Sequence, residues 1–308
     1  MSDIESTLSD IVFSVGNADN ISQRLNTPCG LPRADLKMIQ RPIGTVAVFG
    51  ASNFPLAFST AGGDTAAALA AGCPVVVKGH SAHPGTGEII AEAIHAAIAK
   101  CGLHAGVFSL VQGGTRDVGQ RLVQHPLIKA VGFTGSLAGS RTQFDLCAQR
   151  PEPIPFFGEL RSVNPMFLLP AAASARGETI GTGWADSLLM GAGQFCTNPG
   201  IAAVLEDQTE AFSAATVEAL SKAGSQVMLT DGIAKAYQDG SKRIAGGAGV
   251  QTLLTTTCDQ RNATPYLFQI TAAEWLANAE LGEEVFGPLG LIVTAKDMDE
   301  MRALAKSL

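Results

Sequence analysis

Charged residues are scarce in this chain. Asp, Glu, Lys and Arg together make up 16% of its 308 residues, and the net charge at pH 7 is −7. No basic cluster accompanies this acidic balance, so the electrostatic surface typical of nucleic-acid binding is missing. Hydrophobic residues, at 46%, are too abundant for an intrinsically disordered chain. The length allows one large or two modest domains, each with its own core.

Cysteines are also few, with six in the whole sequence. They are widely scattered and form no Cys-x-x-Cys pair, which argues against a zinc site and against the disulfide framework of a secreted domain. The first residues are acidic and lack a signal-peptide pattern. The uncharged stretch 44–63 contains an asparagine, a proline and several glycines, which indicate strand, loop and helix rather than a membrane span. We therefore expect a cytoplasmic protein with reduced thiols and without metal, membrane or nucleic-acid partners.

Aromatic residues make up only 6% of the chain, so its apolar mass is Ala, Val, Leu and Ile, accompanied by 34 glycines. This composition suits an α/β protein with buried strands and tight turns. In the first half we expect strands at 45–49, 74–78, 107–111 and 129–133 and helices at 55–71, 85–100, 116–124 and 136–149. Such alternation predicts a Rossmann-like, doubly wound parallel sheet that binds ligands at the carboxyl ends of its strands.

The second half is patterned less clearly. The proline-rich segment 151–155 predicts a linker, and residues before 40 suggest a helix over 1–23 and a loop over 26–32. Beyond the linker we expect strands at 166–169, 201–205, 267–270 and 289–293 and helices at 178–190 and 210–222. Residues 223–265 show no clear period. A second α/β domain is therefore expected after the first.

Cys196 is the most informative candidate residue. It follows a glycine-rich, uncharged turn in the motif Gly-Gln-Phe-Cys-Thr at 193–197. Such a turn is poorly suited to packing and well suited to presenting a thiol, and the thiolate is a strong nucleophile. The alternative is a buried cysteine that acts as a small apolar side chain.

Two further candidates are placed to bind an anion. Gly135 and Ser136 end an expected strand and open an expected helix, whose free N–H groups and dipole attract negative charge. An ordinary N-capped helix explains the same residues. Lys78 ends another strand, where the side chain would face the ligand crevice, unless it is simply exposed.

Two polar residues suit acid–base or oxyanion chemistry. Glu159 follows an apolar stretch beside a glycine, and burial would raise its pKa and make it a base. Asn53 follows the first strand, and its amide can donate to an oxyanion. A surface turn accounts for either residue equally well.

Six short motifs occur in the order that is typical of the aldehyde dehydrogenase superfamily. They are Ala-Ser-Asn-Phe-Pro at 51–55, Val-Lys at 77–78, Phe-Thr-Gly-Ser at 133–136, Gly-Glu-Leu at 158–160, Gly-Gln-Phe-Cys-Thr at 193–197 and Glu-Glu-Val-Phe-Gly-Pro at 283–288. Each motif is weak alone, but six in order are hard to obtain by chance. The sequence at 48–55, 62–65 and 193–200 most resembles the 2-oxoglutarate semialdehyde (2,5-dioxopentanoate) dehydrogenase branch.

The resemblance implies a thiol-based oxidation of an aldehyde, such as 2,5-dioxopentanoate to 2-oxoglutarate. The Cys196 thiolate would attack the carbonyl carbon. The Asn53 amide and the Cys196 backbone N–H would hold the oxyanion. A hydride would then pass from the thiohemiacetal carbon to a nicotinamide cofactor, leaving a thioester. Glu159 would activate the water that hydrolyses this thioester.

The resemblance also implies a nicotinamide cofactor and its contacts. Lys78 would contact the adenosine ribose or its phosphate, Gly135 and Ser136 the pyrophosphate, and Glu284 and Phe286 the nicotinamide end. Many relatives that prefer NAD carry a glutamate three residues after this lysine, where this chain has Ser81. Removing a carboxylate removes repulsion toward a 2′-phosphate, so we expect NADP, with NAD as the alternative.

The chain departs from the family in one motif and in length. Arg-Ser-Val at 161–163 stands where the family usually has Gly-Gly-Lys. The resemblance covers about 41–293, and both flanks are shorter than is usual. It therefore implies a truncated chain with a remnant N-terminal segment (1–40), a dinucleotide-binding domain (41–158) and an incomplete catalytic domain (159–308). The family forms homo-oligomers, which a shortened chain need not do.

Three other functions stay open from the sequence. An inactive remnant would bind nucleotide at most. A CoA-dependent acylating dehydrogenase is disfavoured because Glu159 suits hydrolysis. A cysteine hydrolase would pair Cys196 with a histidine, and none of the five histidines lies near it in the sequence.

Overall fold

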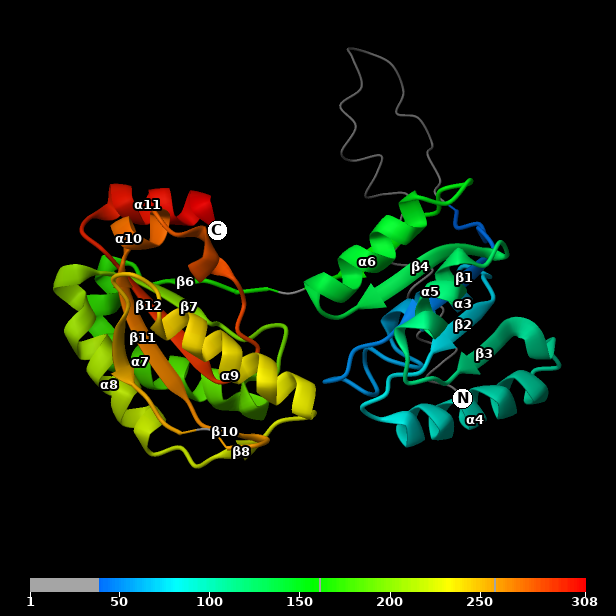
Figure 1. Ribbon diagram of the computed structural model, residues 1–308, viewed down its shortest axis with the longest axis horizontal. Helices are drawn as coiled ribbons and strands as arrows, with labels where there is room; N and C mark the ends of the chain where they lie inside the picture. Colours follow the sequence, from blue (N-terminus) through cyan, green and yellow to red (C-terminus); the bar gives the residue numbers. More distant parts are fainter. Residues whose placement is uncertain (1–38, 161, 258) are drawn as a thin grey trace, which may run out of the picture. The chain divides into compact units, whose positions relative to one another are not determined.

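The computed structural model describes residues 39–160, 162–257 and 259–308 (Figure 1). The chain divides into two compact units, Met1–Leu160 and Arg161–Leu308. The helix and loop expected before residue 33 lie outside the described residues. Within the described ranges, no helix combines the length and the apolar character that crossing a bilayer requires. Each unit has its own central sheet and apolar core.

The sheet of the first unit is parallel throughout. Its described strands are β1 (Thr45–Phe49), β2 (Val75–Lys78), β3 (Phe108–Val111), β4 (Ile128–Thr134) and β5 (Phe156–Glu159). They lie in the order β3-β2-β1-β4-β5. The direction of winding reverses between β1 and β4, which is the switch point where doubly wound sheets bind ligands. The predicted Rossmann-like fold of this half is confirmed.

Helices cover both faces of this sheet (Figure 1). The helices are α3 (Gly63–Ala70), α4 (Pro84–Lys100), α5 (Arg116–Gln124) and α6 (Leu137–Ala148), and a 3₁₀ turn, η1, spans Ala105–Val107. Apolar residues of α3 and α4 pack with Val46, Val48 and Val77 on one face. Residues of α5 and α6 pack with Ala47 and Val131 on the other face. Successive side chains of β1 point to opposite faces of the sheet and therefore pack into two separate cores.

Two sequence expectations in the first unit are wrong. The helix expected at 55–71 begins only at Gly63, because residues 55–62 fold back as turns and the Ala51 N–H donates to the Phe58 carbonyl oxygen at 2.7 Å. The proline-rich segment 151–155 is not a linker between units, because it joins α6 to β5 and β5 pairs with β4 in the same sheet.

The second unit is also built on a mostly parallel sheet. Its described strands are β6 (Met166–Phe167), β7 (Ile201–Leu205), β9 (Gln251–Leu254), β11 (Tyr266–Thr271) and β12 (Leu289–Ala295). The order is β6-β7-β12-β11-β9, and β9 alone is antiparallel to its neighbour. Every residue of β12 is buried, as expected for a central strand covered on both faces. Strands β8 (Gln226–Val227) and β10 (Asn262–Ala263) form a separate two-stranded antiparallel sheet.

Helices again cover both faces. They are α7 (Pro170–Leu189), α8 (Thr209–Ser221), α9 (Asp231–Ala245), α10 (Ala272–Leu276) and α11 (Met298–Ser307), with 3₁₀ turns η2 (Met190–Gly193), η3 (Glu206–Gln208) and η4 (Ala279–Gly282). Helices α7 and α8 pack on one face, and α9, α10 and α11 pack on the other. Helix α7 begins eight residues before the expected start at 178, because Pro170 occupies its first turn and alanines extend it. The unpatterned region 223–265 supplies β8, α9, β9 and β10.

Candidate functional site

In the first unit, the strand register brings several predicted site residues to one edge of the sheet. Phe49, at the end of β1, pairs with Lys78 on β2 and with Phe133 on β4. On the next pair, Thr134 lies opposite Glu159. Asn53 follows β1 and Ser136 follows β4, so both lie at the switch point. Five predicted residues (Asn53, Lys78, Gly135, Ser136 and Glu159) thus follow or end strands at the ligand-binding edge.

The loop that carries Asn53 is folded tightly against the end of β1. The Phe54 and Phe58 rings meet edge to face, with centroids 5.4 Å apart. A Cβ on Gly50 would lie 2.4 Å from the Ser59 Cα, so the chain can approach so closely only with glycine there. His83, from the segment after β2, lies 3.0 Å through Nε2 from the Ala51 carbonyl oxygen. These contacts hold the half-buried Asn53 in a defined loop.

The end of β2 carries a lysine and two stacked histidines. Burial lowers the pKa of Lys78. The pKa of His80 is lowered to about 4 by burial first, and then by the charges of His83 and Lys78. The rings of His80 and His83 stack with centroids 5.3 Å apart. His80 is therefore neutral at physiological pH, and Ser81 beside it is exposed.

The Gly135–Ser136 turn forms an N-cap. The Ser136 Oγ accepts a hydrogen bond from the Gly139 N–H at 3.3 Å at the start of α6. The Gly135 N–H donates to the Glu159 carbonyl oxygen at 3.1 Å, which ties β5 to this turn. The ordinary capping role is therefore observed, and Ser136 with the first residues of α6 is exposed at the ligand-binding edge. Such an exposed N-terminus fits a phosphate group.

Glu159 is exposed at the end of the edge strand β5, so the surface alternative is observed and not burial of its carboxylate. Its neighbour is Asp64 in the first turn of α3, which the sequence reasoning missed. Burial, and then the negative charge of Glu159, raise the pKa of Asp64. A Cβ on Gly132 would lie 3.0 Å from the Asp64 Oδ2, so the missing side chain makes room for the carboxylate.

The strand register shows why Asp64 and Glu159 influence each other. Gly132 pairs with Phe157, and two residues later Thr134 pairs with Glu159. Residues two apart on a strand share a face, so Asp64 and Glu159 lie on the same face of the sheet. Asp64 is the one charged residue between Arg41 and Lys78 in the sequence, and that isolation was the available signal.

In the second unit, Cys196 lies just after a turn with an unusual backbone. Gly191, Ala192 and Gly193 all have positive φ, at 59°, 57° and 65°. Ala192 is buried, which makes its left-handed conformation a local strain that surrounding contacts must hold. Cys196 itself is half-buried with a free thiol.

Side-chain amides hold the cysteine loop on both sides. The Asn164 Nδ2 donates to the carbonyl oxygens of Cys196 at 2.7 Å and of Asn198 at 3.1 Å. The Asn198 Nδ2 donates to the Gly193 carbonyl oxygen at 2.9 Å. The Trp184 indole donates to the Pro199 carbonyl oxygen at 2.6 Å. The loop is therefore fixed through its own carbonyl groups, by residues that carry no reactive chemistry.

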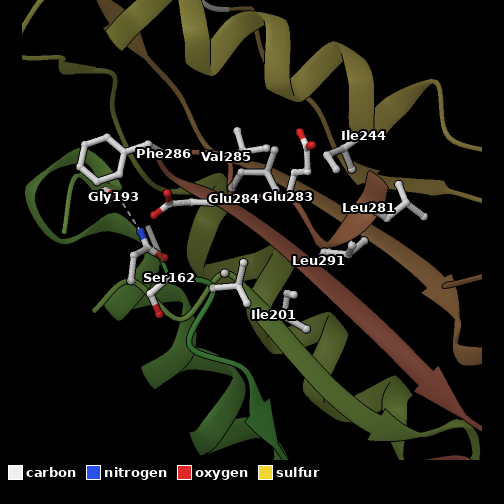
Figure 2. Close-up of a pocket in the computed structure, with 14 residues that line it drawn as sticks. Ser162, Gly193, Ile201, Ile244, Leu281, Glu283, Glu284, Val285, Phe286 and Leu291 are labelled. Carbon is white, nitrogen blue, oxygen red and sulfur yellow. Dashed lines mark hydrogen bonds between the residues drawn. The ribbon is translucent and has the colours of Figure 1, made fainter. Parts of the chain in front are cut away.

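The cysteine loop packs directly against the Glu-Glu-Val-Phe-Gly-Pro motif at 283–288. A Cβ on Gly193 would lie 2.2 Å from the Gly287 carbonyl carbon, so the two backbones touch. Glu284 and Phe286 line a pocket next to this contact, together with Gly193 and Asn198. Figure 2 shows the Glu284 carboxylate directed toward the Gly193 side of the pocket and the Glu283 carboxylate directed away from it. The structure thus brings together the sequence segments of Cys196, Glu284 and Phe286.

The predicted site residues therefore fall into two sets. Asn53, Lys78, Gly135, Ser136 and Glu159 belong to the first unit, with Ser81, and Cys196, Glu284 and Phe286 belong to the second. Among the described residues, no group of three His, Cys, Asp or Glu side chains is placed to hold a metal ion.

Comparison with known proteins identifies the family. The aldehyde dehydrogenase family profile matches residues 1–307. Alpha-ketoglutaric semialdehyde dehydrogenase 2 of Azospirillum brasilense is 47% identical over 93% of this chain and 55% of its own length. Alpha-ketoglutaric semialdehyde dehydrogenase of Acinetobacter baylyi is 45% identical over 87% of this chain and 51% of its own length. The chain thus spans about half the length of these relatives.

Solved structures agree in fold. An NAD-dependent benzaldehyde dehydrogenase from Corynebacterium glutamicum superposes with a TM-score of 0.72 at 24% identity, covering 98% of this chain and 65% of the other. A mutant of aldehyde dehydrogenase C from Pseudomonas syringae, in complex with NAD+ and octanal, gives 0.73 at 24% identity, covering 87% and 56%. At these identities the likeness concerns the fold. Together with the family profile and the close relatives, it shows that this chain belongs to the aldehyde dehydrogenase family.

Proposed function

We propose that this protein oxidises an aldehyde to a carboxylate with a nicotinamide cofactor, and that 2,5-dioxopentanoate, the semialdehyde of 2-oxoglutarate, is its substrate. The observation that carries the proposal is the packing of the Cys196 loop against the segment of Glu284 and Phe286, through Gly193 and Gly287. The substrate is supported by the names of the two relatives at 47% and 45% identity.

In this reaction the Cys196 thiolate attacks the aldehyde carbon, and the carbonyl oxygen becomes an oxyanion. The Asn53 amide and the Cys196 backbone N–H donate hydrogen bonds to that oxygen. Loss of a hydride from the former aldehyde carbon then converts this thiohemiacetal into a thioester, and an oxidised nicotinamide bound there would supply the hydride acceptor, which no side chain provides. Glu159 then removes a proton from the water that hydrolyses the thioester. The exposed position of Glu159 is compatible with contact to water.

The residues of the first unit fit a dinucleotide. Its strand order has a switch point between β1 and β4, and the exposed N-terminus of α6 lies beside it. Gly135 and Ser136 would hold the pyrophosphate there. Lys78 would contact the adenosine ribose. We accordingly propose that residues 41–158 bind the dinucleotide and that residues 159–308 supply the thiol.

The finer proposal is a preference for NADP. Ser81 leaves the region after Lys78 without a carboxylate, so a 2′-phosphate meets no repulsion there. His80 adds no positive charge at neutral pH, because its pKa is lowered to about 4. Lys78 is therefore the group that would attract the phosphate. Comparing kcat/KM for the two cofactors tests this preference, and a clear advantage for NAD would refute it.

The proposed activity is tested by incubating the purified chain with NADP and 2,5-dioxopentanoate and following the absorbance of the reduced nicotinamide. The wild-type chain should form NADPH, and Cys196→Ala should form none. Formation of NADPH by the alanine variant would refute the thiol mechanism. Binding of NADPH without turnover by the wild type would instead support a nucleotide-binding function.

A further inference from the structure

The turn before Cys196 has a strained backbone, and its buried Ala192 N–H needs a hydrogen-bond acceptor. Three successive residues, Gly191, Ala192 and Gly193, have left-handed backbones. The two glycines adopt this conformation freely, but Ala192 does not. Ala192 is 2% exposed, so its N–H is shielded from water and must find a hydrogen-bond acceptor inside the protein.

Gln226 supplies that acceptor from a distant part of the chain. Its Oε1 accepts from the Ala192 N–H at 2.8 Å, and its Nε2 donates to the Leu189 carbonyl oxygen at 3.1 Å. Leu189 is the last residue of α7, so one side-chain amide binds both the end of the helix and the strained turn. Gln226 is held in turn because it is in β8 and pairs with Ala263 of β10.

We propose that Gln226 is a positioning residue for Cys196. The inference rests on the proposed function, in which the Cys196 thiolate is the nucleophile. Gln226 fixes Ala192, and Asn198 and Asn164 fix the carbonyl groups between Ala192 and Asn198. Gln226 therefore restrains the start of the segment that presents Cys196, and Asn164 and Asn198 restrain the rest of it.

The chemistry of the side chain gives a graded test. Gln226→Met keeps the length and removes both hydrogen bonds. Gln226→Glu keeps the acceptor for the Ala192 N–H and loses the donor to the Leu189 carbonyl. Gln238→Met is the matched control, because Gln238 lies on α9, and its amide donates to the exposed Gln260 carbonyl oxygen, which is outside the cysteine loop.

Amide hydrogen exchange of the peptide covering 189–200 is the first measurement, and the split between kcat and KM is the second. Gln226→Met should exchange about 10-fold faster in this peptide and lose about 10-fold in kcat, with KM within about twofold. Gln226→Glu should fall between Gln226→Met and the wild type in both measurements. Gln238→Met should match the wild type.

The outcomes separate this inference from the proposed function. If Cys196→Ala is inactive and Gln226→Met keeps the wild-type kcat, the positioning role is refuted while the thiol mechanism stands. If Cys196→Ala remains active, both are refuted. If Gln226→Met has a lower melting temperature but unchanged amide exchange and an unchanged kcat, the positioning role is also refuted. Should Gln226→Met fail to fold, Gln226→Glu decides by the same two measurements.

Discussion

Replacing Gly193 by alanine tests how the cysteine loop meets the motif of Glu284 and Phe286. Gly193 has a φ of 65°, and a Cβ there would lie 2.2 Å from the carbonyl carbon of Gly287. The positive φ costs about 1 kcal/mol for an alanine. The clash of the new Cβ with Gly287 forces the two backbone segments apart, and overpacking of this kind costs a further 1–3 kcal/mol or so. We expect a total loss of about 3 kcal/mol of unfolding free energy.

Two other glycines separate the strain from the clash. Gly102 has a φ of 66°, and a Cβ there would have no other heavy atom within 4 Å, so Gly102→Ala should lose only about 1 kcal/mol. Gly191 has a φ of 59°, and its Cβ would meet the Phe195 ring at 2.5 Å, which can move because it is a side chain. Gly191→Ala should therefore lose between 1 and 2 kcal/mol or so.

Tryptophan fluorescence during urea unfolding is the assay for Gly191 and Gly193. Both tryptophans of the chain, Trp184 and Trp275, lie in the second unit and are buried, so their emission reports that unit alone. Gly102 belongs to the first unit, and far-ultraviolet circular dichroism follows its unfolding. If Gly193→Ala loses no more stability than Gly191→Ala, the contact with Gly287 does not constrain the loop and the reasoning fails.

Three further predictions concern the titratable groups and the helix cap. Because burial and Glu159 raise the pKa of Asp64, its charged form weakens the first unit above that pKa, and the cost fades as the pH falls toward 3.8. Asp64→Asn should thus be more stable than the wild type near pH 8, with the gap closing in acid, as measured by urea unfolding with circular dichroism. Burial raises the pKa of Cys147 to about 11, so iodoacetamide at pH 8 should modify it at least about a hundredfold more slowly than exposed Cys101, as peptide mass spectrometry would show. Comparable rates would contradict its burial. Ser136→Ala should lose about 1 kcal/mol through the missing cap, and an unchanged urea midpoint would contradict that bond.

The first unit was predictable because its signals are local. Its strands are four to seven residues long and mostly apolar, and their alternation with helices specifies a parallel sheet. The rule that ligands bind at strand ends then led to Lys78 and Ser136. The error at 55–62 arose because two close backbone approaches, at Gly50 and Gly62, override the helix propensity of the alanine- and leucine-containing segment.

The second unit was less predictable because its important contacts are long-range. Gln226 acts on residues 34 and 37 positions away, and Asn164 on residues 32 and 34 positions away. Neither has a local pattern that marks it, since a single glutamine or asparagine is ordinary in a loop. Asp64 differs, because an isolated charge in an apolar stretch indicates a specific environment.

The cysteine loop illustrates how a strained backbone persists at a candidate catalytic site. A left-handed alanine is unfavourable by about 1 kcal/mol, which is comparable to one typical hydrogen bond. Gln226 accepts a hydrogen bond from the Ala192 N–H, and Asn198 and Asn164 donate to carbonyl oxygens of the residues that follow, so the gain exceeds the strain. An unstrained turn would need fewer such contacts. The number of amides directed at this one loop is therefore itself a reason to assign it a function that depends on the exact orientation of Cys196.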